Sequence, residues 1–260
     1  MNLGKVLDRS FKILRDNFIL IYTIVLVFYF PAFFLNLAVR YMEVQTQMAT
    51  VGPFLQTTGL LVSFMTIGAF VIVWFFIYPL GIMAVTSAIF NIYTGSKASA
   101  VDAYKTALRL YPQALVLNII VGLLATIGFM LCMIPMVIPL VFFYLVFPVC
   151  VVERQGIFAS LERSYKLSGN NFFTILIIIF LVSIVKWPVS AACAAVAQSV
   201  FSAASLESIF FHALIDFLGV AIVAPVGIVV TAMVYFELRE IKEGFDLELM
   251  AWHVTENLKL

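Results

Sequence analysis

Three ionisable residues, Lys186, His212 and Asp216, stand inside or beside long apolar stretches of this 260-residue chain. Such residues are candidates for function by default, because a charge in hydrocarbon is unfavourable. His212 and Asp216 are four residues apart and would share one helical face, as a proton-linked or metal-binding pair would. Two ligands without a third make a weak metal site. About 22 residues separate Asp216 from Leu238, roughly a bilayer thickness at 1.5 Å per residue, which favours polarity at the outer membrane interface.

Lys186 would lie about two-thirds of the way across a span that begins near Phe172. One interpretation is a side chain that reaches back to the outer interface beside Trp187, an aromatic anchor. The other is an ion pair with Asp216, or part of a substrate path. The sequence leaves both interpretations open, so Lys186, His212 and Asp216 together form a candidate intramembrane polar site.

The sequence contains no motif that predicts catalysis. GxSxG, HExxH, P-loop and GxGxxG patterns are absent, and no basic patch interleaved with aromatics indicates nucleic-acid binding. The cysteines Cys132, Cys150 and Cys193 lie in apolar runs without CxxC spacing, as small buried or lipid-facing residues do. We therefore predict no enzyme activity, no catalytic residue, no metal, no cofactor and no nucleic-acid partner.

The composition is that of a membrane protein. Hydrophobic residues make up 64% and charged residues 11%, against roughly half and a quarter in soluble domains. A span needs about 20 apolar residues, and the sequence predicts an all-α protein with six spans, at 18–39, 60–87, 114–133, 135–152, 172–191 and 217–236. Pro135 and Pro139 supply the break between the third and fourth spans.

The basic residues lie almost entirely on one side of this topology. Of the 15 lysines and arginines, only Arg40 and Lys186 fall on the other side. The positive-inside rule then places both termini in the cytoplasm and requires an even number of spans. The basic segments would attract anionic lipid headgroups at the cytoplasmic face.

A charged phrase occurs twice. "LDRSFKILRDNF" at 7–18 and "LERSYKLSGNNF" at 161–172 agree at six of twelve positions, and a weaker version, "VDAYKTALRLYPQAL", occupies 101–115. Apolar residues recur in each at spacings of three and four, which predicts helices lying at the cytoplasmic interface. We therefore predict three parallel repeats, about 1–93, 94–152 and 153–245, each an interfacial helix plus a two-span hairpin, followed by an amphipathic cytoplasmic tail at 246–260.

Each even-numbered span carries a proline: Pro79, Pro148 and Pro225. A proline bends a helix and frees the carbonyl four residues back, which in hydrocarbon must face protein, water or a side-chain donor. We expect these spans to turn the defect inward. Spans two, four and six would then form an inner layer, with spans one, three and five outside it.

Three segments carry a resemblance to a known family: "LGKVLDRSFKILRDNF" at 3–18, "GIFASLERSYKLSGNNFF" at 156–173 and "YFELREIKEGFDLEL" at 235–249. Together they resemble the bacterial membrane-protein family named after the membrane domain of glycerophosphoryl diester phosphodiesterases. Some members of that family are fused to a catalytic barrel, for which the six predicted spans leave no room here. The resemblance therefore implies an inner-membrane protein and transfers no activity.

Two classes of function remain open at this stage. A non-catalytic membrane module, such as an envelope- or lipid-related scaffold, is favoured by the scarcity of charge near the membrane midplane. A transporter or channel for a small molecule or lipid is favoured by the proline-bent helices, since broken helices often line cavities. A continuous polar cavity would support transport, and a packed bundle would support the scaffold.

Overall fold

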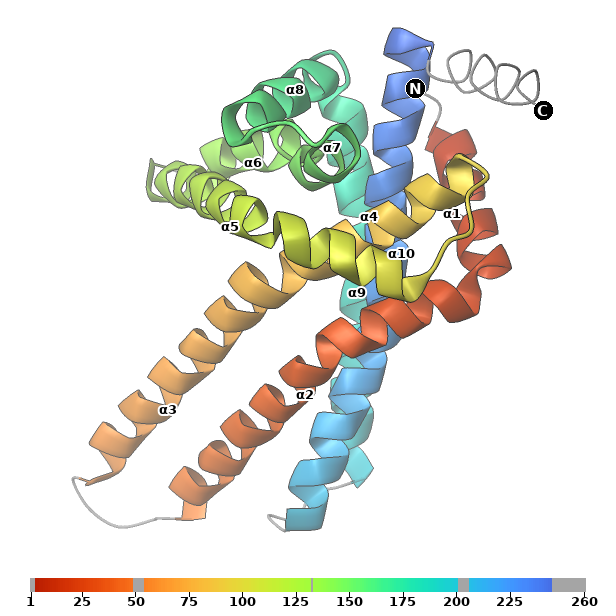
Figure 1. Ribbon diagram of the computed structural model, residues 1–260. Helices are drawn as coiled ribbons and strands as arrows, with labels where there is room; N and C mark the ends of the chain where they lie inside the picture. Colours follow the sequence, from red (N-terminus) through yellow and green to blue (C-terminus); the bar gives the residue numbers. More distant parts are fainter. Residues whose placement is uncertain (1–2, 49–53, 132, 201–205, 245–260) are drawn as a thin grey trace.

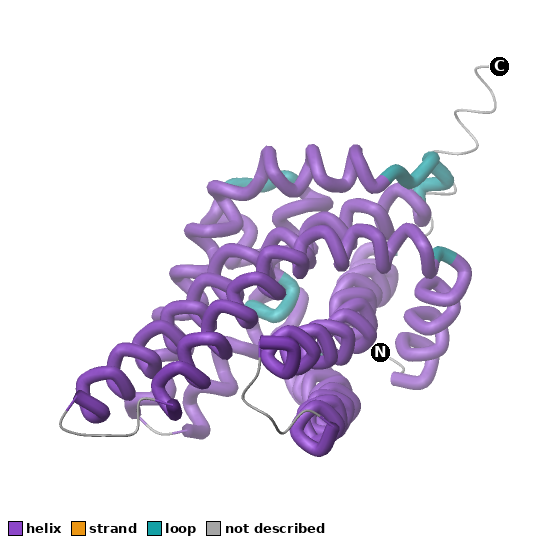
Figure 2. Tube along the Cα trace, turned by 90° about the horizontal axis from the view of Figure 1, so that it is seen from below, coloured by secondary structure: helices purple, strands orange, loops and turns teal. Residues whose placement is uncertain are grey.

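The computed structural model describes residues 3–48, 54–131, 133–200 and 206–244. Within them the chain is helical, with a few short loops (Figure 2). The elements in chain order are α1 (Leu3–Asp16), α2 (Phe18–Met48), α3 (Phe54–Ile72), the π-helical turn η1 (Val73–Ile77), α4 (Tyr78–Tyr93), α5 (Ala100–Leu131), α6 (Met133–Phe142), α7 (Val146–Glu153), α8 (Ile157–Gly169), α9 (Phe172–Val200) and α10 (Leu206–Glu243). The predicted tail at 246–260 lies outside the described residues.

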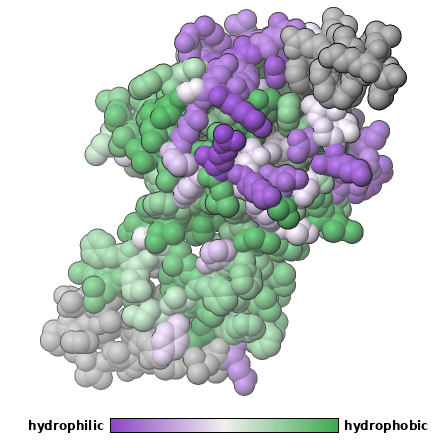
Figure 3. Space-filling view, in the orientation of Figure 1, coloured by the Kyte–Doolittle hydropathy of each residue, from purple (hydrophilic) through white to green (hydrophobic). Residues whose placement is uncertain are grey.

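Six of the helical segments are long and apolar enough to cross a membrane. Hydrophilic residues gather over the upper part of the molecule in Figure 3, around α1 and the start of α5, and hydrophobic residues cover the lower part. A bilayer demands this pattern, because a helix satisfies its own backbone hydrogen bonds and can present apolar side chains to lipid on every side. The chain is an all-α, multi-pass membrane protein, as the sequence predicts.

Burial separates the spans into an inner and an outer layer. In the most apolar stretch of each even-numbered span, 56%, 44% and 72% of the residues are buried, for the segments Phe75–Tyr93, Ile134–Glu153 and Glu207–Glu243. The corresponding shares are 22%, 22% and 11% in the odd-numbered spans. The three even-span prolines are buried, whereas Pro31 and Pro188 are exposed. The expected inner layer of spans two, four and six is therefore present in the packing.

The inner layer consists of α4, α7 and α10, which contact one another pairwise. Around it the contacts run in a cycle. Helices α1 and α2 of the first predicted repeat pack on α10 of the third, α5 of the second packs on α4 of the first, and α8 and α9 of the third pack on α7 and α6 of the second. The division into repeats stays a prediction, and this cyclic packing supports it.

Two of the three predicted interfacial helices form as separate elements, α1 and α8. In each, a serine from the repeated phrase faces the bundle: Ser10 is 3% exposed and Ser164 is 0% exposed. The following aromatic residues, Phe11 and Tyr165, are 54% and 53% exposed. The Ser10 hydroxyl donates to the carbonyl of Val6 within α1, and the Ser164 hydroxyl donates to the carbonyl of Phe142 in α6, which ties α8 to that helix.

The third predicted interfacial helix, at 101–110, is wrong as a separate unit. It continues without interruption into span three as the 32-residue helix α5. The other two copies end at asparagines, Asn17 and Asn170, which adopt turns readily. The third copy has Pro112 and Gln113 in this region and no asparagine or glycine, and Pro112 is accommodated inside the helix. In Figure 1, α5 and α6 lie crosswise to the lower parts of α9 and α10.

The chain departs from regular α-helix about one turn before two of the even-span prolines. The π-helical turn η1 precedes Pro79, and the turn residues 143–145 precede Pro148. The carbonyl of Phe75, four residues before Pro79, accepts a hydrogen bond from Asn118 Nδ2 at 3.3 Å. A side-chain donor from α5 thus satisfies the freed carbonyl, as the environment requires. Helix α10 continues unbroken through Pro225.

Candidate functional site

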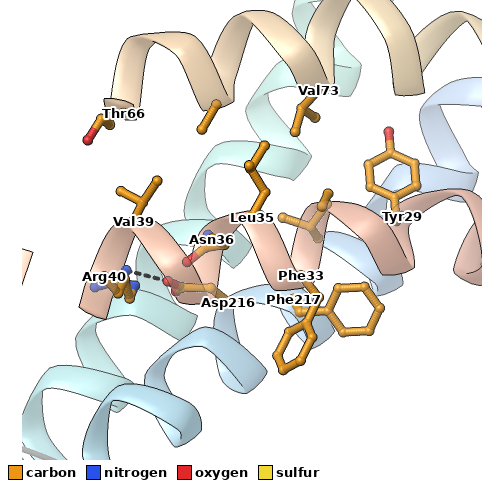
Figure 4. Close-up of a pocket in the computed structure, with 13 residues that line it drawn as sticks. Tyr29, Phe33, Leu35, Asn36, Val39, Arg40, Thr66, Val73, Asp216 and Phe217 are labelled. Atoms are coloured by element: carbon orange, nitrogen blue, oxygen red, sulfur yellow. Dashed lines mark hydrogen bonds and ion pairs between the residues drawn. The ribbon is translucent and has the colours of Figure 1, made fainter. Parts of the chain in front are cut away.

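A cavity of about 440 Å³ lies between α2, α3 and α10. Figure 4 shows Leu35 and Val39 of α2 facing Thr66 and Val73 on the α3 side, with Asp216 of α10 below them. Among the described residues, α3 packs mainly on α2 and continues into η1. Its other faces are largely uncovered, and this leaves the cavity open. Most of the lining is aliphatic or aromatic, and the polar groups are few.

Two of the residues that line this cavity, Arg40 and Asp216, form an ion pair. Arg40 Nη2 of α2 donates to Asp216 Oδ2 of α10, and Figure 4 shows the two side chains pointing toward each other. Arg40 Nε is buried and has no hydrogen-bond partner among the described residues. Phe33 reinforces this crossing of α2 and α10, with its ring 5.4 Å from that of Phe217. Of the two interpretations left open for Lys186, an ion pair with Asp216 is not formed, because the Asp216 carboxylate pairs with Arg40.

His212 is half-buried on α10, one turn from Asp216 as its spacing predicts. The described residues contain no group of three or more His, Cys, Asp or Glu side chains arranged to hold a metal ion. His212 and Asp216 thus share a helical face. The ion-pair partner of Asp216, however, is Arg40 on another helix.

The side chain of Lys186 lies against helix α10. A methyl group placed on Gly227 of α10 would come within 2.6 Å of Lys186 Nζ and 2.8 Å of its Cε. Gly227 is about 11 residues, or roughly 16 Å, from Leu238 near the C-terminal end of α10. The ammonium group therefore lies against bare backbone near the middle of the bundle. The interpretation that Lys186 reaches back to the membrane interface beside Trp187 does not fit this position, because the ammonium group contacts α10 and helical side chains lean toward the helix N-terminus.

A second cavity, of about 430 Å³, surrounds Lys186 between α2, α4, α9 and α10. Ser183 and Ser190 lie on the same face of α9 as Lys186, at spacings of three and four residues. The phenol-bearing residues Tyr29 and Tyr78 form part of the opposite wall. This polar stripe was visible in the sequence as S-x-x-K-x-x-x-S, but the periodicity alone does not say that the stripe faces inward.

The end of the bundle at which α1 and α8 lie, which is predicted to be cytoplasmic, carries a network of ion pairs that includes the first repeated phrase. Arg9 of α1 donates to Glu240 at 2.8 Å and to Glu237 at 3.2 Å, both on α10. Lys5 lies 3.7 Å from Glu237. The hydrogen bond to Glu240 raises the pKa of Arg9 above its ordinary value, although partial burial opposes this. Glu237 and Glu240 are 3% and 8% exposed, so these are carboxylates largely removed from water.

Arg163 of the second repeated phrase, which corresponds to Arg9, lies in the same network. Arg163 of α8 donates from Nε to Glu153 at 3.0 Å, and its Nη2 pairs with Glu243 of α10. Tyr235 donates its hydroxyl to the same Glu153 at 3.0 Å. Helix α10 ends directly after this network, where Gly244 adopts a positive φ of 64°, the left-handed conformation that glycine tolerates best.

When Tyr104 and Lys105 of the third copy are set against Phe11 and Lys12, Asp102 lies at the position of Arg9 and Arg163, and Ala103 at that of Ser10 and Ser164. Ala103 is buried, like the two serines. The third copy therefore has no arginine at the position from which the other two copies pair with glutamates.

Comparisons of the chain with known protein families, with curated proteins and with solved structures find no match. The functional interpretation therefore rests on the cavities and the ion-pair network. Sequence reasoning singled out Lys186, His212, Asp216 and the two arginine phrases, but it did not identify Arg40 as the partner of Asp216. The one available signal was that Arg40 and Lys186 are the two basic residues outside the cytoplasmic segments.

Proposed function

We propose that this chain is a non-catalytic, integral module of a bacterial inner membrane, with both termini in the cytoplasm and an envelope- or lipid-related scaffolding role. The three segments that resemble the membrane domain of glycerophosphoryl diester phosphodiesterases support this assignment. Two of them, 3–18 and 156–173, supply Arg9 and Arg163, and the third supplies Glu237, Glu240 and Glu243. Segments far apart in the chain thus act as one structural unit.

The observation that carries the proposal is the contrast between the two halves of the bundle. From Ile228 to Leu238 every residue of α10 is buried, and α4 and α7 pack against this helix. The ion pairs of Arg9 and Arg163 tie α1 and α8 to the same end. The cavities around Arg40 and Lys186 lie in the other half. A bundle closed at the cytoplasmic end suits a scaffold better than a channel.

The alternative is a transporter or channel for a small molecule or lipid. It is favoured by one specific observation: the cavities contain Arg40, Asp216 and Lys186, charged residues that are rare within membrane spans and often belong to substrate paths. A transporter would have to open the packed cytoplasmic half, where the buried carboxylates of Glu237 and Glu240 hold Arg9.

Membrane lipids are the proposed partners. Exposed basic residues on the cytoplasmic side, including Lys12, Arg15 and Lys105, would attract anionic headgroups at about 1 kcal/mol for each well-placed side chain. No nucleic-acid contact and no enzymatic step are part of the proposal.

Two measurements test the function. The first is lipid and metabolite profiling of a deletion strain, with wild type and Arg9→Met/Arg163→Met as complementing genes. A scaffold predicts altered envelope lipids in the deletion strain, restored by wild type and not by the double variant. The second is flux of fluorescent lipid or small solutes in proteoliposomes. Flux clearly above that of empty vesicles would replace the scaffold with the transporter, and unchanged lipids in the deletion strain would remove the lipid-related role.

A further inference from the structure

Lys186 is a cation inside the membrane without an anionic partner. Among the side chains that the structure describes, Asp216 is engaged by Arg40, and no ion pair or hydrogen bond joins Lys186 to any residue. Its ammonium group is accommodated by the missing side chain of Gly227. A glycine at this position leaves room for a charged group that the protein itself does not neutralise, and isolated charges in hydrocarbon are retained where they have a use.

The cavity around Lys186 has the composition of a binding pocket for an amphipathic molecule. One wall is the polar stripe Ser183, Lys186 and Ser190 on α9. The rest includes aliphatic residues of α10, among them Val223 and Ala224. Most of the surface that this cavity exposes is thus apolar, with one cation and a few hydroxyl groups to orient a ligand, the usual arrangement of small-molecule sites.

The cavity also continues toward the ion-paired cleft. Tyr29, Val73 and Val220 line both the cavity around Lys186 and the cavity between α2, α3 and α10. The two spaces therefore meet at a common apolar wall. Trp187, directly beside Lys186, is 78% exposed, so this part of α9 faces the surrounding lipid.

We propose that the Lys186 cavity binds an anionic amphiphile from the surrounding membrane, a molecule with one phosphate or carboxylate group and at least one acyl chain. The anionic group pairs with the Lys186 ammonium group and accepts hydrogen bonds from the Ser190 hydroxyl. The acyl chain extends along the shared wall of Tyr29, Val73 and Val220. No bond is made or broken. This inference deepens the lipid-related role proposed above and rests on it for the choice of an anionic lipid over a soluble anion.

Lipid binding to the full-length protein in a zwitterionic detergent tests the site. Native mass spectrometry would give the dissociation constant of the first bound phosphatidylglycerol, with phosphatidylcholine of the same acyl chains and chain-free glycerol phosphate as comparison probes. The variants are Lys186→Met, which keeps the length of the side chain without its charge, and Lys186→Arg. Lys166→Met is the matched control, because this exposed lysine already pairs with Glu162 on α8.

We expect phosphatidylglycerol to bind at least tenfold more tightly than phosphatidylcholine or glycerol phosphate. Lys186→Met should weaken phosphatidylglycerol binding about tenfold and leave phosphatidylcholine binding unchanged, Lys186→Arg should stay within threefold of wild type, and Lys166→Met within twofold. Gly227→Ala is an independent variant, because its methyl group would displace the ammonium group, and it should weaken phosphatidylglycerol binding as well. A thermal midpoint measured for each variant identifies any that fails to fold.

Any of three results would overturn the proposed site. The Lys186→Met variant could bind phosphatidylglycerol as tightly as wild type does. The wild-type protein could bind phosphatidylcholine, or glycerol phosphate, as tightly as it binds phosphatidylglycerol. The last would indicate a site for soluble anions. None of them bears on the scaffold itself, because profiling of the deletion strain and flux in proteoliposomes do not depend on Lys186. Conversely, unchanged lipids in the deletion strain would leave a measured binding constant intact.

Discussion

Replacing Arg9 by methionine should destabilise the protein much more than replacing an exposed lysine. The change keeps most of the apolar stem of the side chain, which packs against neighbours, and removes the charge. Arg9 donates to Glu240 at 2.8 Å and to Glu237 at 3.2 Å, and these carboxylates are 8% and 3% exposed. Without the guanidinium group, two nearly buried carboxylates remain close together on consecutive turns of α10.

The magnitude follows from burial. Removing one partner of a fully buried ion pair costs about 3–5 kcal/mol, because the other charge is left without compensation. Arg9 is 34% exposed and Lys5 remains 3.7 Å from Glu237, so water and the lysine reduce the loss. We expect a decrease of about 2 kcal/mol in the free energy of unfolding. The control is Lys166→Met. Its pair with Glu162 has side chains 66% and 65% exposed, so no measurable change is expected.

The free energy of unfolding is measured by titration with sodium dodecyl sulfate in mixed micelles, followed by far-ultraviolet circular dichroism. A double-mutant cycle between Arg9→Met and Glu240→Gln isolates the pair, and a coupling of about 1–2 kcal/mol is expected between directly contacting charges. If Arg9→Met costs no more than Lys166→Met, the network does not stabilise the cytoplasmic end, and the explanation of the repeated phrase fails.

Three further predictions concern the helix defects, the close helix crossings and the topology. Asn118→Leu removes the donor to the Phe75 carbonyl and should cost about 1–3 kcal/mol of unfolding free energy in the same titration, whereas an unchanged value would mean that water satisfies the carbonyl. Gly128→Ala would bring a methyl group within 2.8 Å of the Met136 backbone, so it should cost about 1–3 kcal/mol. Gly68→Ala, with open space around it, should be neutral, and equal effects of the two variants would contradict the packing. Reporter fusions after Leu55 and after Leu206 should read external, and a cytoplasmic signal at either would refute the six-span map. A fusion at position 132 tests whether the α5–α6 hairpin crosses the bilayer, since a cytoplasmic signal there alone would indicate a hairpin that enters and leaves on the same side.

The sequence by itself determined the class of protein and most of its helices. Apolar runs of bilayer length predict spanning helices because no other open backbone structure satisfies its hydrogen bonds in lipid. Spacings of three and four predicted α1 and α8. The even-span prolines predicted which helices are buried, because a freed carbonyl has to turn away from hydrocarbon. Local chemistry decides each of these features, so local sequence is enough.

Tertiary structure decided where the charges go. Arg40 and Asp216 are separated by 176 positions, and Arg9 and Glu240 by 231. Their pairing depends on how each helix is rotated about its own axis. In a soluble helix the polar face reveals that rotation, but in a membrane span both the lipid-facing and the protein-facing sides are apolar. Hydropathy therefore carries little information about rotation, and the placement of Lys186 against Gly227 could be learned only from the packed bundle.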